Sequence, residues 1–185
     1  MKRKMLIGFT AVAGAGKDTA ASSIAVHQKS VEIMAFAKPL KDACKILFNF
    51  TDEQLYDPVK KEEMDPVWER SPRKILQWLG TDVLREHINK EFFTINMKQR
   101  IEESKAEYIV ISDVRFDNEA ELIKSMGGYI IKIVRENATT TQHSSHATEQ
   151  GISPHLIDHT LENDGTLEDF HEKVGRLVRL LKYHT

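Results

Sequence analysis

The chain has 185 residues, with 26 Lys and Arg against 28 Asp and Glu, which gives a formal net charge of −2. Hydrophobic residues make up 41% and charged residues 29%, a balance typical of a globular protein with one sizeable core. No long basic run favours binding to nucleic acid, and no apolar run is long enough to cross a membrane. A single cysteine, Cys44, excludes an internal disulfide, is expected to pack in a core, and favours a reducing cytoplasm.

Apolar runs that predict buried strands alternate along the chain with segments of helical pattern. Strands are expected at 4–10, 31–37, 108–114, 129–135 and within 155–163. Helices are expected at 17–28, 38–50, 51–56, 71–87, 91–105, 117–128 and 166–183. This alternation predicts an α/β fold in one domain, 1–185, with a parallel sheet of about five strands flanked by helices. The stretch 38–106 is too long for one crossover and predicts a helical insertion.

The segment AGAGKDT (13–19) connects the first strand to the first helix. Its glycines let the backbone fold around an anion, and the free N–H groups of the helix N-terminus point at the same place. Lys17 would neutralise phosphates during transfer. The common phosphate-loop pattern has glycine where this chain has Ala11 and a hydroxyl where it has Asp18, with Thr19 one residue later. Either Asp18 or Thr19 could ligate magnesium, and a plain glycine turn is the alternative to a phosphate loop.

A second group of polar residues, ISDVRFDNEAE (111–121), follows the third expected strand. Ligands of open α/β sheets bind at the carboxyl ends of the strands, which makes Asp113 a candidate magnesium partner beside the loop. Arg115 and Glu119 follow on the same edge. A surface salt bridge is the alternative for this group, and helix N-termini favour an acidic residue such as Glu119 in any case.

A third group lies in the expected insertion. Arg73, Gln77 and Thr81 are spaced four residues apart and would share one helix face, with Gly80 beside them. An arginine can fork onto a phosphate, and a glutamine can pair with a base edge through a donor and an acceptor. On the pattern alone, an ordinary solvated face remains the alternative.

Four histidines gather near the end of the chain: His143, His146, His155 and His159. Their spacing fits no standard zinc pattern, so surface or lid positions are favoured over a metal site. A lid-like loop is expected at about 136–154, and residues 136–160 contain no lysine or arginine. If the chain transfers a phosphoryl group, its charge would be met by Lys17, magnesium and arginines outside this loop, for which Arg73, Arg115 and Arg135 are the candidates.

The segments GAGKDT, SPRKILQWLGTDVLRE, ISDVRFDNEAELIKSMGG and HATE with LENDGTLEDF together resemble the bacteriophage-type deoxynucleoside monophosphate kinases, over about 5–178. The resemblance implies a P-loop NTPase fold and transfer of the γ-phosphoryl group of ATP, with Mg²⁺, to a deoxynucleoside monophosphate for DNA precursor synthesis. Another small-molecule P-loop kinase, such as a phosphomevalonate kinase, and a non-catalytic nucleotide-binding module are the alternatives. The oligomeric state, monomer or homodimer, stays open.

The resemblance also implies a set of site residues in this chain. ATP would bind at Ala13, Gly14, Ala15, Gly16, Lys17, Asp18 and Thr19, and Mg²⁺ at Asp18, Thr19 and Asp113. Catalytic roles fall on Lys17, Asp18, Asp113, Arg115 and Glu119, and the acceptor nucleotide on Arg73, Gln77, Gly80, Thr81 and Phe93. The sequence departs from the family in two ways. Ala15 stands where a serine is common, and Phe92 or Phe93 would replace an expected tryptophan.

Overall fold

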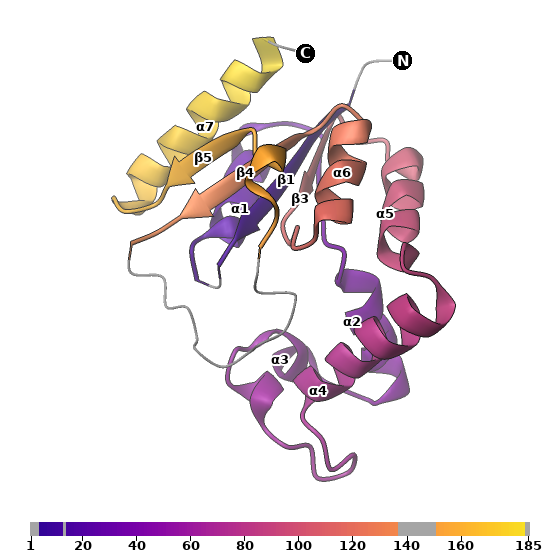
Figure 1. The fold of residues 1–185 in the computed structure, drawn as a ribbon. Coiled ribbons are helices and arrows are strands. Elements are labelled where there is room, and N and C mark those ends of the chain that lie inside the picture. The colour runs from indigo at the N-terminus through magenta and orange to yellow at the C-terminus, as the bar shows by residue number, and fades with distance from the viewer. Residues whose placement is uncertain (1–3, 13, 137–150, 184–185) are drawn as a thin grey trace. The chain divides into compact units, whose positions relative to one another are not determined.

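A parallel sheet of five strands is the framework of the protein (Figure 1). The computed structural model describes residues 4–12, 14–136 and 151–183. The strands are β1 (Met5–Ala11), β2 (Val31–Met34), β3 (Tyr108–Ile111), β4 (Tyr129–Val134) and β5 (His159–Glu162). They lie in the order β2-β3-β1-β4-β5, and every neighbouring pair is parallel. The predicted α/β class, with about five parallel strands, is confirmed.

The chain divides into two compact units, a larger one of residues 1–35 with 97–185 and a smaller one of residues 36–96. The larger unit contains the sheet, α1 (Lys17–His27), α6 (Asp117–Ser125), η4 (Pro154–Leu156) and α7 (Leu167–Tyr183). The smaller unit contains α2 (Lys38–Leu47), α3 (Asp52–Tyr56), η1 (Lys60–Glu62), α4 (Pro72–Gln77) and the π-helix η2 (Trp78–Ile88). Helix α5 (Phe92–Glu103) begins in the smaller unit and ends in the larger one.

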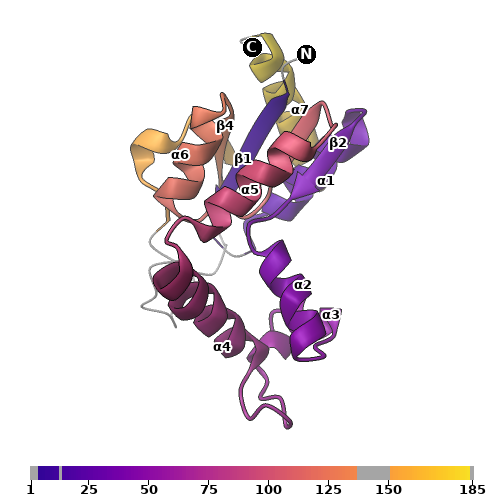
Figure 2. The ribbon, with the colours of Figure 1, turned by 90° about the vertical axis from the view of Figure 1, so that its right-hand side faces the viewer.

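Both faces of the sheet are covered by helices (Figures 1 and 2). Alternate residues of β1, namely Met5, Ile7 and Phe9, join a buried cluster with side chains of α1 and α7. Gly8 lies on the opposite face, close to Ile123 of α6. Because a strand buried on both faces needs apolar residues at successive positions, residues 5–9 of β1 form a run without a polar side chain, and Thr10 follows them.

Helix α6 ends at the double glycine, as the sequence predicts. Gly127 adopts a left-handed φ of 77°, and its N–H donates to the carbonyl of Lys124 at 2.9 Å. The N–H of Gly128 donates to the carbonyl of Ile123 at 2.9 Å. A Cβ on Gly128 would lie 2.8 Å from the carbonyl oxygen of Leu6, so this residue also allows the turn to approach β1.

The smaller unit has its own apolar cluster. Its buried members are Cys44, Phe50, Leu55 and Ile75. Burial raises the pKa of the Cys44 thiol to about 11, and the side chain is fully enclosed, which confirms a packing role. A capping box at the start of α3, expected from the sequence, is present. The Thr51 N–H donates to Gln54 Oε1 at 2.9 Å, and the Gln54 N–H donates to Thr51 Oγ1 at 3.2 Å.

The prediction of one regular helix over 71–87 is wrong for the second half of that segment. The α-helix α4 ends at Gln77 and continues as the π-helix η2, where the Asn89 N–H donates to the carbonyl of Leu84, five residues back, at 3.0 Å. Gly80 is the buried residue of η2, and a Cβ there would lie 3.0 Å from Leu40 Cδ2. The wide turn therefore places bare backbone against α2, an effect of packing that helical periodicity does not encode.

Two strands are also shorter than predicted. β2 ends at Met34 and β3 at Ile111, each three residues before the end of its apolar run. Phe36 and Val114 are nevertheless buried, with 4% and 2% of their surfaces exposed. The apolar pattern thus continues past the hydrogen-bonded ladder because these residues still pack in the interior.

Substitution of Gly8 by alanine is expected to destabilise the protein by about 1–3 kcal/mol, the range for overpacking a well-filled core. A Cβ there would lie 2.7 Å from Ile123 Cδ1, 2.9 Å from Ile130 Cδ1 and 3.0 Å from Val114 Cγ2. Gly175→Ala is the matched control. Its Cβ would meet only Arg179 Nη1 at 3.6 Å, so it should stabilise α7 by about 0.5–1 kcal/mol. Urea unfolding of both variants checks the pair, and equal effects would contradict the packing assigned to Gly8.

Candidate active site

The loop between β1 and α1 has the backbone of an anion-binding turn. Gly14 and Gly16 have left-handed φ values of 78° and 105°, on either side of a buried Ala15. Left-handed residues of this kind are found in backbone turns whose N–H groups bind anions, and Gly16, the N-cap residue of α1, offers no side chain of its own to the helix N-terminus. The Ala15 N–H donates to the carbonyl of Val12 at 3.3 Å. Ala11 lies in β1 and does not have the positive φ that would require glycine, which explains how the chain does without the first glycine of the common pattern.

Lys17 and Asp18, the first residues of α1, form an ion pair. Lys17 Nζ donates to Asp18 Oδ2 at 3.1 Å, and the two side chains are 23% and 77% exposed. A pair with one partner so exposed contributes little to stability. The Asp18 carboxylate is therefore accessible to a cation, and the Lys17 ammonium is held close to the loop.

Asp113 lies at the edge of the sheet where the loop begins. The Ser112 N–H donates to the carbonyl of Met34, and the Val114 N–H donates to the carbonyl of Phe9, each at 3.1 Å. Asp113 is thus held between the carboxyl ends of β2 and β1, and its side chain is half-buried. Since β1 and β3 are neighbouring parallel strands, the structure brings Asp113 and the loop to the same edge, as the strand-end pattern predicts.

Glu119 supports the turn that follows Asp113. It is 2% exposed, and its Oε2 accepts hydrogen bonds from the N–H groups of Arg115 at 2.9 Å and Phe116 at 3.3 Å. Glu119 lies in the first turn of α6, where a carboxylate can accept hydrogen bonds from backbone N–H groups and interact favourably with the helix dipole. Arg115 itself is exposed. Glu119 as placed therefore acts on backbone and positions Arg115.

The acceptor candidates lie in the smaller unit. Arg73 is half-buried and forms an ion pair with Glu62, and Gln77 follows at the end of α4. Thr81 is exposed, whereas Gly80 is buried against Leu40. This packing contact explains why a glycine stands at position 80 without any role in nucleotide binding.

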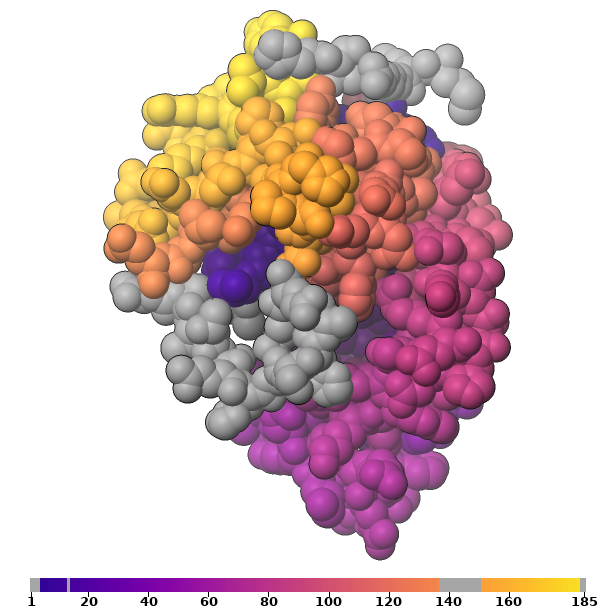
Figure 3. Space-filling view, viewed as in Figure 1, coloured from indigo at the N-terminus to yellow at the C-terminus, as the bar shows by residue number. Residues whose placement is uncertain are grey.

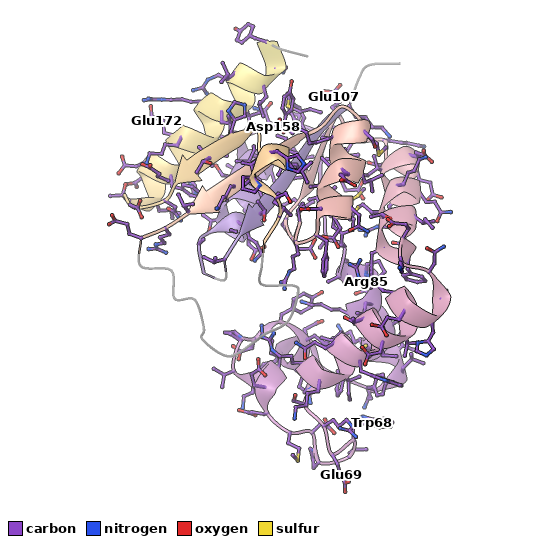
Figure 4. All side chains as sticks on the ribbon, in the orientation of Figure 1. Trp68, Glu69, Arg85, Glu107, Asp158 and Glu172 are labelled. Carbon is purple, nitrogen blue, oxygen red and sulfur yellow. The ribbon has the colours of Figure 1, made fainter. Side chains whose placement is uncertain are left out.

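Phe93 is only 6% exposed, and the guanidinium of Arg85 lies 4.7 Å from its ring centroid. Its ring also meets that of Phe92 edge to face, with centroids 5.4 Å apart. In this conformation Phe93 supports Arg85, which projects from the π-helix (Figure 4), more directly than it offers an open face to a base. An arginine stacked on an aromatic ring in this unit was not expected from the sequence.

Some predicted positions lie outside the described residues: Ala13, His143, His146 and most of the lid-like loop. His155 is in η4 and His159 is in β5. Within the described ranges, no group of three or more His, Cys, Asp or Glu side chains could hold a metal ion by itself. No helix in the same part of the chain is long and apolar enough to span a membrane.

Sequence reasoning missed Asn163, which follows β5. Its Nδ2 donates to the carbonyl of Ala15, in the loop, at 2.8 Å. The only signal in the sequence is the segment LENDGT before the last helix, and nothing in that segment indicates a contact 148 residues away.

Comparisons with known proteins show the family and the fold of the chain. The family model for deoxynucleotide monophosphate kinases matches residues 59–174. A putative deoxynucleotide monophosphate kinase of Acanthamoeba polyphaga mimivirus is 39% identical over 184 residues, covering 92% of this chain and 94% of that protein. The deoxynucleotide monophosphate kinase of Escherichia phage RB69 is 28% identical, covering 71% of this chain and 54% of that protein. The crystal structure of TT1252 from Thermus thermophilus, 15% identical, shares the fold with a TM-score of 0.55 over 97% of this chain and 99% of that one.

Proposed function

Because the chain belongs to the deoxynucleotide monophosphate kinase family, we propose that it transfers the γ-phosphoryl group of ATP to a deoxynucleoside monophosphate, giving ADP and the diphosphate. The observation that carries the proposal is the loop itself. Two left-handed glycines and Lys17 open α1 at the same sheet edge as Asp113. Phosphoryl transfer needs positioned N–H groups and cations around the phosphates, and this edge supplies both.

In this proposal the loop N–H groups and Lys17 bind the β- and γ-phosphates of ATP. The residues present fit Mg²⁺, since Asp18, Thr19 and Asp113 offer oxygen donors at one edge and Asp18 is 77% exposed. Mg²⁺ held by these residues would supply positive charge against the charge that develops on the transferring phosphoryl group. Arg115, fixed by Glu119, stabilises the charge that moves between donor and acceptor. We propose the cytoplasm, where ATP and the monophosphates occur, as its compartment.

Asp18→Ala is expected to raise the magnesium concentration needed for half-maximal rate, because one oxygen ligand is lost. Asp18→Ser, which restores the hydroxyl of the common pattern, should keep more activity than Asp18→Ala. Magnesium titration of the initial rate at fixed ATP measures both. If Asp18→Ala and the wild type titrate identically, the metal role of Asp18 is wrong, and the carboxylate serves only Lys17 and the helix N-terminus.

Arg73→Lys is expected to raise the KM for the monophosphate about tenfold with little change in kcat, because an ammonium cannot reproduce a forked contact with phosphate. Glu62→Gln should have the opposite effect. Glu62 pairs with Arg73 and competes with the substrate phosphate for the guanidinium, so its neutralisation should lower that KM. Steady-state kinetics decides the pair. A change confined to the KM for ATP in both variants would remove Arg73 from the acceptor site.

A substrate panel tests the function directly. The protein is incubated with ATP, Mg²⁺ and each of the deoxy- and ribonucleoside monophosphates in turn, and ADP and diphosphate are measured together. Equal amounts of ADP and a deoxynucleoside diphosphate support the proposal. If no monophosphate yields a diphosphate, the proposal is overturned in favour of another small-molecule P-loop kinase or a non-catalytic nucleotide-binding module.

A further inference from the structure

The phosphate loop is held from outside by the residue that follows β5. Asn163 Nδ2 donates to the carbonyl oxygen of Ala15 at 2.8 Å; Ala15 is buried and Asn163 is half-buried. Figure 3 shows indigo surface of the N-terminal part of the chain beside coral and orange surface of the later part. Asn163 thus links the end of the edge strand β5 to the loop between β1 and α1.

Asn163 is itself firmly placed. Its backbone N–H donates to the carbonyl of Val134, at the end of β4, at 2.9 Å. The β4–β5 ladder pairs Val134 with Glu162, the residue just before Asn163. The amide therefore extends from the edge of a sheet and not from a free loop, so it can fix the position of the group that it contacts.

The packing around Gly16 shows that the loop and Asn163 fit each other. A Cβ on Gly16 would lie 2.4 Å from Asn163 Nδ2 and 3.6 Å from Phe170 Cε1. The amide therefore occupies the side of Gly16 from which a side chain would project. Gly16 is required at this position for two reasons, its φ of 105° and the space that Asn163 fills.

The direction of one peptide group follows from this contact. The Ala15–Gly16 peptide is trans, and in a planar trans peptide the carbonyl of one residue and the N–H of the next point in opposite directions. Asn163 holds the Ala15 carbonyl on the outer side of the loop. The Gly16 N–H must then point away from Asn163, toward the concave side where N–H groups bind anions.

We infer that Asn163 is a positioning residue for the phosphates of ATP, which acts by fixing the Ala15–Gly16 peptide so that the Gly16 N–H faces them. The inference rests on the proposed function, because it requires the loop to bind a nucleotide. Without the amide, the peptide can rotate and point a carbonyl oxygen at the phosphates. Preorganised donors are valuable to an anion site because they need no reordering when the anion arrives.

The experiment uses two probes, Mg–ATP and Mg–tripolyphosphate, which has the phosphates without base or ribose. The Kd of each is measured for the wild type and for Asn163→Ala. Loss of one neutral hydrogen bond should weaken both probes by the same factor, about fivefold to tenfold. Asn163→Asp, nearly the same shape, should lose more, because a carboxylate cannot donate to the carbonyl and adds negative charge beside the phosphates. Thr166→Ala is the matched control, since Thr166 lies in the same connection but is exposed and caps α7, accepting a 3.1 Å hydrogen bond from the Asp169 N–H.

The outcomes distinguish a failure of the proposed function from a failure of the role assigned to Asn163. Wild type that binds neither probe overturns the proposed function, and this inference falls with it. Wild type that binds, with variants within twofold of it, leaves the function in place and overturns the role of Asn163. Weaker binding of Mg–ATP with unchanged tripolyphosphate would mean that Asn163 contacts base or ribose, which also overturns it. An equal loss in Thr166→Ala would reduce the effect to general stability.

Discussion

Replacing Lys17 with alanine is expected to lower kcat by about 100- to 1000-fold, the usual effect of removing an electrostatic group from a developing phosphoryl charge. Lys17 is the cation adjacent to the left-handed glycines, and its ammonium is held 3.1 Å from Asp18. Lys17→Arg should recover only part of the rate, because its planar group cannot take the place of a compact ammonium in a tight loop.

The Lys17→Ala variant should fold normally. The Lys17–Asp18 pair involves a carboxylate that is 77% exposed, so its loss should change the melting temperature little. Lys29→Ala is the control, because Lys29 is an exposed lysine beyond the other end of α1. Circular dichroism, thermal unfolding and initial rates are measured for all three variants. A kcat for Lys17→Ala within threefold of the wild type would exclude the loop as the phosphoryl-transfer site.

Arg115→Ala is expected to lower kcat by on the order of 100-fold with a much smaller change in either KM, as for a charge that acts mainly in the transition state. Arg115 is exposed, while its backbone N–H is held by the buried carboxylate of Glu119 at 2.9 Å. A fixed backbone with an exposed side chain suits a residue that must reach phosphates only when they are present.

Glu119 provides a graded test of the same idea. Glu119→Gln retains an oxygen that can accept from the Arg115 N–H, so it should lower kcat less than Glu119→Ala does. Arg176→Ala is the matched control, because Arg176 is an exposed arginine of α7 whose partner is Glu172. If Arg115→Ala and Arg176→Ala have the same kcat, the transferring charge is met by another arginine, and Arg135 is the next candidate.

Much of the fold could be predicted because its strands are buried on both faces. Residues such as Leu6 and Ile7 then form unbroken apolar runs, and the alternation of such runs with helices leaves few arrangements other than a parallel sheet. The edge position of Asp113 follows from the same reasoning, since parallel strands end at a common edge. Helix stops at Gly127 and Gly128 depend on local backbone chemistry that the sequence states directly.

Other features depend on tertiary contacts that no local pattern contains. The spacing of Ile75, Leu79 and Val83 fits an α-helix, yet packing of Gly80 against Leu40 accompanies a change to a π-helix. The sequence left Glu119 undecided between catalysis and helix capping, and its burial and its two backbone partners depend on the fold, which no local pattern contains. The contact between Asn163 and Ala15 joins residues 148 positions apart, and no periodic pattern in the sequence indicates it.

The enclosed thiol of Cys44 has a practical consequence for spectroscopy. Maleimides and similar reagents attack thiolates, and a cysteine with a pKa of about 11 has roughly one thiolate in a thousand molecules at pH 8. Since it is also the sole cysteine of the chain and is fully buried, the unaltered protein should incorporate almost no label while folded. Cysteines introduced at exposed positions of the larger and smaller units, such as Lys29 and Glu69, would then carry fluorophores selectively. Energy transfer between them could follow the two units as nucleotides bind, with the native side chain of Cys44 left in place.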